Sequence, residues 1–300
     1  MGTGFWWFYD TIAVATLLVC IFLSGRKGFM KAVFSAIGCA VALLVAFAVS
    51  SGVSGDLYKN TARSNNIKKL EKDLKKETFT QKYASYLENM GYYIKVDTAK
   101  LEKAFESETE LDKAICNYIN NINARKVESN EAVLLEKVRE GYAVVMSDII
   151  GQTLNKFVAE TAANQIREDS SNIREVILLI KNNEHQHESA VYISDNFTQK
   201  AYTTIFRLII FVVLYLVMAL IIIAVINSFT KSSDVSFEST GSHIAGGFIG
   251  IVTGAIMIFA VSAVIRLWAI MGNNEMLFFN NDVIDKTYIF KYFYDLTMKM

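Results

Sequence analysis

Residues 208–226 read LIIFVVLYLVMALIIIAVI, an uncharged run of 19 apolar or aromatic residues. As an α-helix this run would extend about 28 Å, which is close to the hydrocarbon thickness of a bilayer. Arg207 directly precedes it, and a long basic side chain can reach the headgroups from such a position. The stretch therefore predicts a membrane-spanning helix over about residues 206–228.

Three further apolar runs predict three more spans, over about residues 5–23, 30–50 and 244–270. The first begins with the aromatic run FWWFY, which is typical of a membrane interface. No Lys or Arg precedes this run and Arg26 and Lys27 follow it, so a retained span is favoured over a cleaved signal peptide. A hydrophobic content of 52% agrees with a membrane protein.

Small residues line one face of the second and of the fourth predicted span. They are Gly38, Ala42 and Ala46 in the second, and Gly246, Gly250 and Gly254 in the fourth. Such faces allow helix backbones to approach closely in lipid, so we expect the two faces to pack on each other. The alternative for the glycine face is the lining of a pore.

The turn over residues 24–31 contains Arg26, Lys27 and Lys31 and no acidic residue. Short basic loops stay in the cytoplasm, so this turn predicts a cytoplasmic side. Both termini and residues 56–204 are then expected to be extracytoplasmic.

A polar insert, residues 56–204, separates the two pairs of spans. Residues 57–204 hold 21 Lys and Arg and 22 Asp and Glu, so the insert is nearly neutral. Apolar residues in it recur at three- and four-residue spacing, as in amphipathic helices. Three such stripes are Leu111, Ile115, Tyr118 and Ile122; Leu135, Val138, Tyr142, Val145 and Ile149; and Ile173, Val176, Ile177 and Ile180.

The predicted fold is therefore all-α, a polytopic membrane protein with a large helical extramembrane insert. Residues 1–55 form a first transmembrane hairpin and residues 205–271 a second, with the insert between them. Residues 272–300 are rich in Phe and Tyr among charged residues, which is typical of an amphipathic helix at an interface. The formal net charge of zero gives no basic field for nucleic acid, so the expected partner is the lipid bilayer.

Among the ionisable residues in the predicted spans are Asp10 and Arg266. Ionisable side chains in spans can mark ion paths. Asp10 lies beside an aromatic belt, so we favour a helix cap at interface depth for it. For Arg266 we favour a side chain that extends to the headgroups. Their matching predicted depth suggests that the two side chains pair.

His185 and His187 are candidate metal ligands, because histidine is a common ligand of metal ions. Histidines two residues apart diverge on a helix and no third ligand is indicated, so a solvated loop is favoured and no metal or cofactor is predicted. No P-loop, dinucleotide fingerprint, nucleophile elbow or Cys pair with metal spacing occurs, which favours a protein that is not an enzyme.

Four short motifs resemble the colicin V production protein (CvpA) family of bacterial inner-membrane proteins. They are Asp10-Thr11-Ile12, Gly25-Arg26-Lys27-Gly28-Phe29, the glycine-rich opening Gly241 to Gly247, and Val283-Ile284-Asp285-Lys286-Thr287. Ser242 and His243 replace the Arg or Lys that the family usually carries beside these glycines, and the insert is larger than in compact members.

The resemblance implies an accessory membrane protein for toxin production, secretion or envelope homeostasis, with no catalytic residue. Its expected partners are an envelope or secretion protein bound through the insert, and further copies of itself bound through the spans. The alternatives are an oligomeric small-solute channel or transporter and, with less support, a membrane-bound hydrolase that uses the insert.

Overall fold

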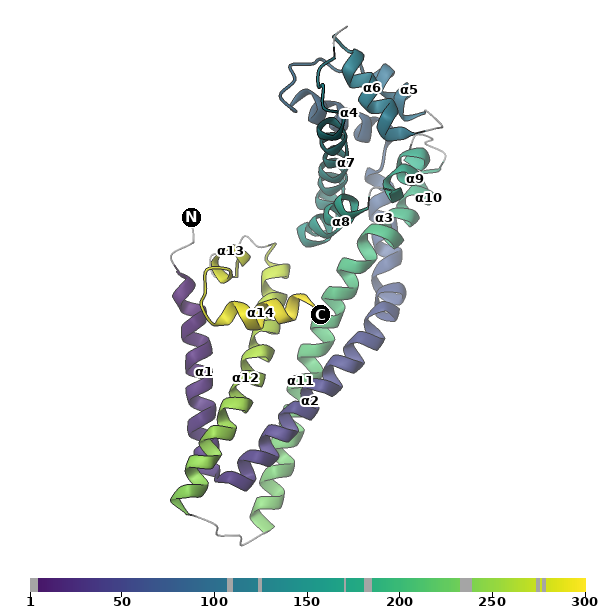
Figure 1. Ribbon diagram of the computed structural model, residues 1–300. Coiled ribbons are helices and arrows are strands. Elements are labelled where there is room, and N and C mark those ends of the chain that lie inside the picture. Colours follow the sequence, from purple (N-terminus) through teal and green to yellow (C-terminus); the bar gives the residue numbers. More distant parts are fainter. Residues whose placement is uncertain are drawn as a thin grey trace. The chain divides into compact units, whose positions relative to one another are not determined.

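The computed structural model describes residues 5–106, 110–123, 126–169, 171–180, 185–232, 239–273, 276 and 279–300, without the side chains of residues 76, 77, 171 and 229–232. This part of the chain is all helical and contains no strand. The chain divides into two units, the membrane unit (Met1–Gly55 and Thr204–Met300) and the insert unit (Asp56–Thr203). Figure 1 labels the helices of both units.

Four helices are long and apolar enough to cross a membrane, which confirms the predicted number of spans. They lie in α1 (Trp6–Lys27), α2 (Phe29–Leu57), α11 (Gln199–Ser232) and α12 (Thr240–Met271). The protein is thus a multi-pass membrane protein that contacts the bilayer. The helices run past the ends of the predicted spans because a helix can continue into water where the hydropathy signal stops.

Within the membrane unit, α1 packs along α12, and the two helices lie side by side in Figure 1. Two short helices, α13 (Asn281–Ile284) and α14 (Phe290–Met298), pack on this pair. The shared core consists of Tyr9, Ala13, Ile258, Ile265, Val283, Ile284, Phe290 and Tyr294. Large apolar side chains face outward along the spans, as bilayer contact requires: Leu44 is 64% exposed and Leu220 is 67% exposed.

The insert unit begins where α2 continues through a π-helical turn, η2 (Tyr58–Ala62), into α3 (Arg63–Asp73). It ends where α10 (Gln186–Ile193) continues through a second π-helical turn, η4 (Ser194–Thr198), into α11. Between them lie α4 (Lys76–Glu88), α5 (Thr98–Phe105), α6 (Leu111–Asn121), α7 (Glu131–Thr153), α8 (Lys156–Glu168) and α9 (Ser171–Ile180).

The core of the insert unit is aromatic and aliphatic. The Tyr83 ring is fully buried and stacks on Tyr142 with ring centroids 5.2 Å apart, while Phe79 and Phe105 contact its other sides. The predicted stripes supply much of this core, since Val138, Tyr142, Val145 and Ile149 and all four residues of the 173–180 stripe are buried. In α6, Leu111 and Ile115 are buried as expected, but Ile119 is buried in place of Tyr118, whose hydroxyl accepts a hydrogen bond from Asp97 N.

Candidate functional site

Asp10 fastens the C-terminal tail to α1. Its Oδ2 accepts a hydrogen bond from Tyr288 N at 2.8 Å, and its Oδ1 accepts from Ile289 N at 2.9 Å and Phe290 N at 3.0 Å. These N–H groups lead into the first turn of α14, where they have no acceptor within the helix and where a negative charge is favoured. Asp10 therefore caps a helix, as its position suggested, but the helix is α14 rather than its own.

Arg266 is buried in α12 and makes no pair with Asp10. Its side chain is 5% exposed, and Nη1 has no hydrogen-bond partner. The expected pair is not formed: the Asp10 oxygens accept from backbone N–H groups of residues 288–290 instead. Burial raises the pKa of the Tyr294 phenol, and the Arg266 cation opposes that rise.

The glycine face of α12 packs against α1, not against α2. A Cβ atom on Gly246 would lie 2.7 Å from Ser24 O, and one on Gly250 would lie 2.6 Å from the Cα of Ile21. The expected contact with Gly38 is therefore wrong, since Gly38 faces Ile222 of α11 at 2.5 Å by the same measure. Ala42 and Ala46 are fully buried on α2. The glycine spacing marked a close helix contact without identifying the partner helix.

The basic turn and the two histidines lie in different surroundings. Arg26 and Lys27 end α1, and Lys31 lies in the first turn of α2. His185 Nδ1 lies 2.7 Å from a Glu188 oxygen, while His187 Nδ1 lies 3.3 Å from a Glu71 oxygen. The two rings thus have separate carboxylate partners, and no group of three metal-ligating side chains occurs among the described residues.

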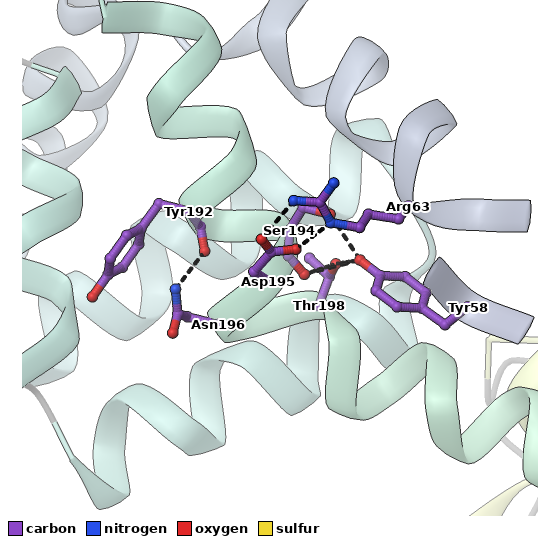
Figure 2. Close-up of polar contacts among 7 residues, drawn as sticks. All are labelled: Tyr58, Arg63, Tyr192, Ser194, Asp195, Asn196 and Thr198. Carbon is purple, nitrogen blue, oxygen red and sulfur yellow. Dashed lines mark hydrogen bonds and ion pairs between the residues drawn. The ribbon is translucent and has the colours of Figure 1, made fainter. Parts of the chain in front are cut away.

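A buried polar cluster joins the two π-helical turns of the insert unit (Figure 2). Tyr58 Oη donates a hydrogen bond to Ser194 O at 2.9 Å and lies 2.7 Å from Ser194 Oγ and 3.2 Å from Thr198 Oγ1. All three side chains are fully buried. Beside them, Arg63 donates two hydrogen bonds to the Asp195 carboxylate, at 2.6 and 2.7 Å.

This cluster holds two helices together at positions more than 130 residues apart in sequence. Within the π-helical turn η4, Ser194 O accepts hydrogen bonds from the Tyr58 hydroxyl and from Thr198 Oγ1 at 3.0 Å. Among the described residues, the Ser194 hydroxyl lies against the Tyr58 hydroxyl, and no hydrogen bond links it to a histidine or carboxylate. Sequence reasoning missed the cluster because no short-range pattern links η2 to η4.

A charged cleft of about 670 Å³ lies at the meeting point of α6, α7, α8 and α9. It is lined by Glu110, Leu111, Asp112, Lys113, Leu135, Arg139, Arg167, Glu168, Asp169, Ile173 and Arg174. Four of these side chains are basic and four are acidic, and three are apolar. The volume is within the range of pockets that bind ligands or peptide side chains.

Ion pairs fix several of the basic side chains at this cleft. Arg139 Nε donates to Asp112 Oδ2 at 2.8 Å, and Arg167 donates two hydrogen bonds to Glu140 at 2.6 and 2.8 Å. Arg167 holds the pKa of the Glu140 carboxyl below its usual range. The cleft therefore presents oriented charges of both signs together with apolar side chains, which suits recognition of a polar segment. No protein-family model, curated protein or solved structure matches this chain.

Proposed function

We propose that this protein is a membrane-anchored accessory protein without enzymatic activity, which binds a partner protein through its insert unit. In line with the resemblance to the colicin V production protein family, the proposed partner belongs to a secretion, toxin-production or envelope-maintenance system. The observation that carries this proposal is the charged cleft, because it is a concave surface on an otherwise well-packed helical unit. Oriented charges of both signs favour a specific protein partner over a lipid or nucleic acid.

Photo-crosslinking in native membranes tests this proposal. A photoreactive amino acid replaces Leu135, which lines the cleft, or Tyr93, which is 95% exposed and does not line it. We expect one discrete heterologous adduct from position 135 and none from position 93. The same adducts from both positions, or none from either, would contradict a partner site at the cleft.

A matched charge reversal sharpens this test. Glu168→Lys changes an exposed lining residue, and Glu106→Lys changes an exposed glutamate that does not line the cleft. We expect the adduct from position 135 to fall several-fold in Glu168→Lys and to persist in Glu106→Lys, because a reversed charge opposes complementary recognition. Equal adduct yields in the two variants would place the partner elsewhere.

We further propose that the insert unit is extracytoplasmic, on the basis of the basic turn with Arg26, Lys27 and Lys31. Cys116 is a poor reporter of sidedness, because burial raises the pKa of its thiol to about 11. An exposed thiol at Tyr93→Cys, in a Cys116→Ser background, avoids this problem. We expect a membrane-impermeant maleimide to label it in intact cells; labelling only after lysis would reverse the orientation.

One observation favours a second function, a small-solute conduit formed by several copies. Arg266 is a nearly buried cation in a span with an unpartnered Nη1, and such residues often serve transport. If this function holds, Arg266→Gln abolishes solute flux in proteoliposomes while the photo-adduct of position 135 persists. If the accessory function holds, Arg266→Gln leaves partner capture unchanged and no flux is measured in either form.

A further inference from the structure

A groove of about 670 Å³ lies in the membrane unit where α1 ends and α12 begins. Figure 1 shows these two helix ends side by side, next to the turn that leads into α2. The lining residues are Ile21, Phe22, Gly25, Arg26, His243, Ile244, Gly247, Phe248 and Ile251. The groove thus combines apolar walls with two nitrogen-bearing side chains.

The concave shape follows from glycines on both helices. Gly25 and Gly247 line the groove without side chains, and a Cβ atom on Gly25 would lie 3.9 Å from the Cα of Gly247. On either side, Phe22 is 61% exposed and Phe248 is 67% exposed. The walls are therefore large apolar side chains that the protein itself leaves uncovered.

The polar end of the groove carries the positive charge of Arg26 and the imidazole ring of His243. The Arg26 guanidinium lies 5.7 Å from the centre of the Phe22 ring. His243 Nδ1 lies 2.8 Å from the carbonyl oxygen of Gly25, which accepts, so Nδ1 carries the hydrogen. The ring is thereby held at the groove with Nε2 as its other polar atom, which accepts hydrogen bonds in the neutral ring and donates only in the protonated ring. The turn itself is basic, since residues 11–55 contain no acidic residue, and the nearest acids before α12, Asp234 and Glu238, lie outside the described residues.

We propose that this groove binds one anionic phospholipid from the leaflet that contains the turn between α1 and α2. The phosphate accepts from the Arg26 guanidinium and from Nε2–H of a protonated His243 ring, and an acyl chain runs along the walls toward Ile251. Charge complementarity selects this occupant, since bulk lipid covers any apolar helix face without regard to its headgroup. A second copy of the chain is disfavoured, because a symmetric contact through this groove would bring two basic turns together.

Native mass spectrometry of the purified full-length protein tests this proposal. The protein is offered equal amounts of phosphatidylglycerol and phosphatidylcholine with identical acyl chains. We expect one retained phosphatidylglycerol per chain. Replacing Arg26→Gln and His243→Gln together should weaken its retention at least about fivefold relative to phosphatidylcholine, which corresponds to roughly 1 kcal/mol for one basic group near a membrane surface.

Two comparisons separate the groove from a diffuse charge effect. Lys31→Gln removes a charge from the same turn without changing the groove lining, and should leave retention unchanged. Gly247→Leu places a side chain in the groove, where a Cβ atom meets only Ile21 atoms at 3.7 and 4.0 Å, so we expect a folded protein that has lost the lipid.

Four outcomes would overturn the proposal. The first is equal retention of the two lipids by the unaltered protein, and the second is an equal loss of lipid in Lys31→Gln and in the double variant. The third is displacement of the lipid by soluble glycerol phosphate. The fourth is a dimer that excludes lipid and that dissociates in Gly247→Leu. If Gly247→Leu does not fold, the double variant and Lys31→Gln still decide the question.

Discussion

The membrane unit and the insert unit are both helical, but different side chains hold their helices together. In the membrane unit, α1 and α12 meet through glycines, and most large apolar side chains of the spans point outward. In the insert unit, α4, α5 and α7 meet through large rings, of which Tyr83 is the most central, and charged residues face outward.

The difference follows from the two solvents. Water drives apolar side chains of the insert together, so size contributes directly to stability. Lipid offers no such drive, so close backbone approach and dispersion contacts must hold the spans together. Substitutions that change side-chain size should therefore act in opposite directions in the two units: removing volume damages the insert, and adding volume damages the seam between α1 and α12.

The largest expected effect is the loss of the Tyr83 ring. Tyr83→Ala removes a fully buried ring that stacks on Tyr142, and should lower the stability of the insert unit by about 3–5 kcal/mol. Hydrogen exchange of the full-length protein in detergent should show faster exchange in residues 56–203, with α1 and α12 unchanged. Tyr93→Ala, at a 95% exposed site, is the control. Equal acceleration in both units would mean that they do not unfold separately.

The converse change is the addition of volume at Gly250. Gly250→Ala brings a Cβ atom within 2.6 Å of the Ile21 backbone, so α1 and α12 must separate. We expect a loss of roughly 3 kcal/mol, at the upper end of overpacking, because backbone cannot rotate away. Thermal unfolding in detergent should show this loss. Gly52→Ala is the matched control on α2, since its Cβ atom meets nothing within 4 Å. Equal melting temperatures of the two variants would contradict a close contact between α1 and α12.

Asp10 tests a place where the membrane unit relies on polar contacts. Asp10→Ala leaves three N–H groups of residues 288–290 without their acceptor, and should release the tail at a cost of roughly 2 kcal/mol. Amide exchange at these three residues reports the release. Asp10→Asn keeps one oxygen and should have a smaller effect; protection that survives Asp10→Ala would show that aromatic packing alone holds α14.

Tyr58 tests the polar join within the insert unit. Tyr58→Phe removes the hydroxyl that donates to Ser194 O and leaves the ring in place, so we expect a loss of about 1 kcal/mol. Exchange of the amides in η4 should quicken. Tyr192→Phe, whose hydroxyl makes one long 3.4 Å contact, should change nothing. A null result for both variants would show that the two π-helical turns form without this hydrogen bond.

The smallest expected effect comes from the exposed pair of Glu140 and Arg167. Both side chains are more than a third exposed, so solvent screening limits the pair to roughly 0.5 kcal/mol. Because the folded-state pKa of Glu140 is lowered, its contribution is complete above the unfolded pKa and disappears as the pH falls through the folded value. A double-mutant cycle with Glu140→Gln and Arg167→Gln should show this coupling at pH 7 and not in strong acid. Coupling that persists in acid would exclude the ionic origin.

The sequence predicted the features that depend on local periodicity. The run at residues 208–226 has one environment along its whole length, and the three-four spacing around Tyr142 defines a single buried face. Both signals are contained within one helix, so they require no knowledge of any other part of the chain.

Features that depend on distant residues could not be predicted in this way. Gly246 and Gly250 marked a close contact, but hydropathy does not distinguish α1 from α2 as the partner. Asp10 is of a residue type that often caps helices, yet the helix that it caps begins about 280 residues later. The charged cleft brings together side chains from four helices, and the order of these helices along the chain does not predict that they form a cleft.

The bond between Asp10 and the start of α14 also orders events during synthesis. Residues 56–203 are contiguous, so the insert unit has all of its own residues as soon as position 203 has left the ribosome. Tyr288, which donates to the Asp10 carboxylate, is synthesised 278 residues after it. Until then the Asp10 carboxylate lacks its backbone donors, and the rings of Trp6 and Tyr9 lack their contacts with Tyr288 and Phe290. The membrane unit is thus completed last, by a segment that arrives when every span has already been made.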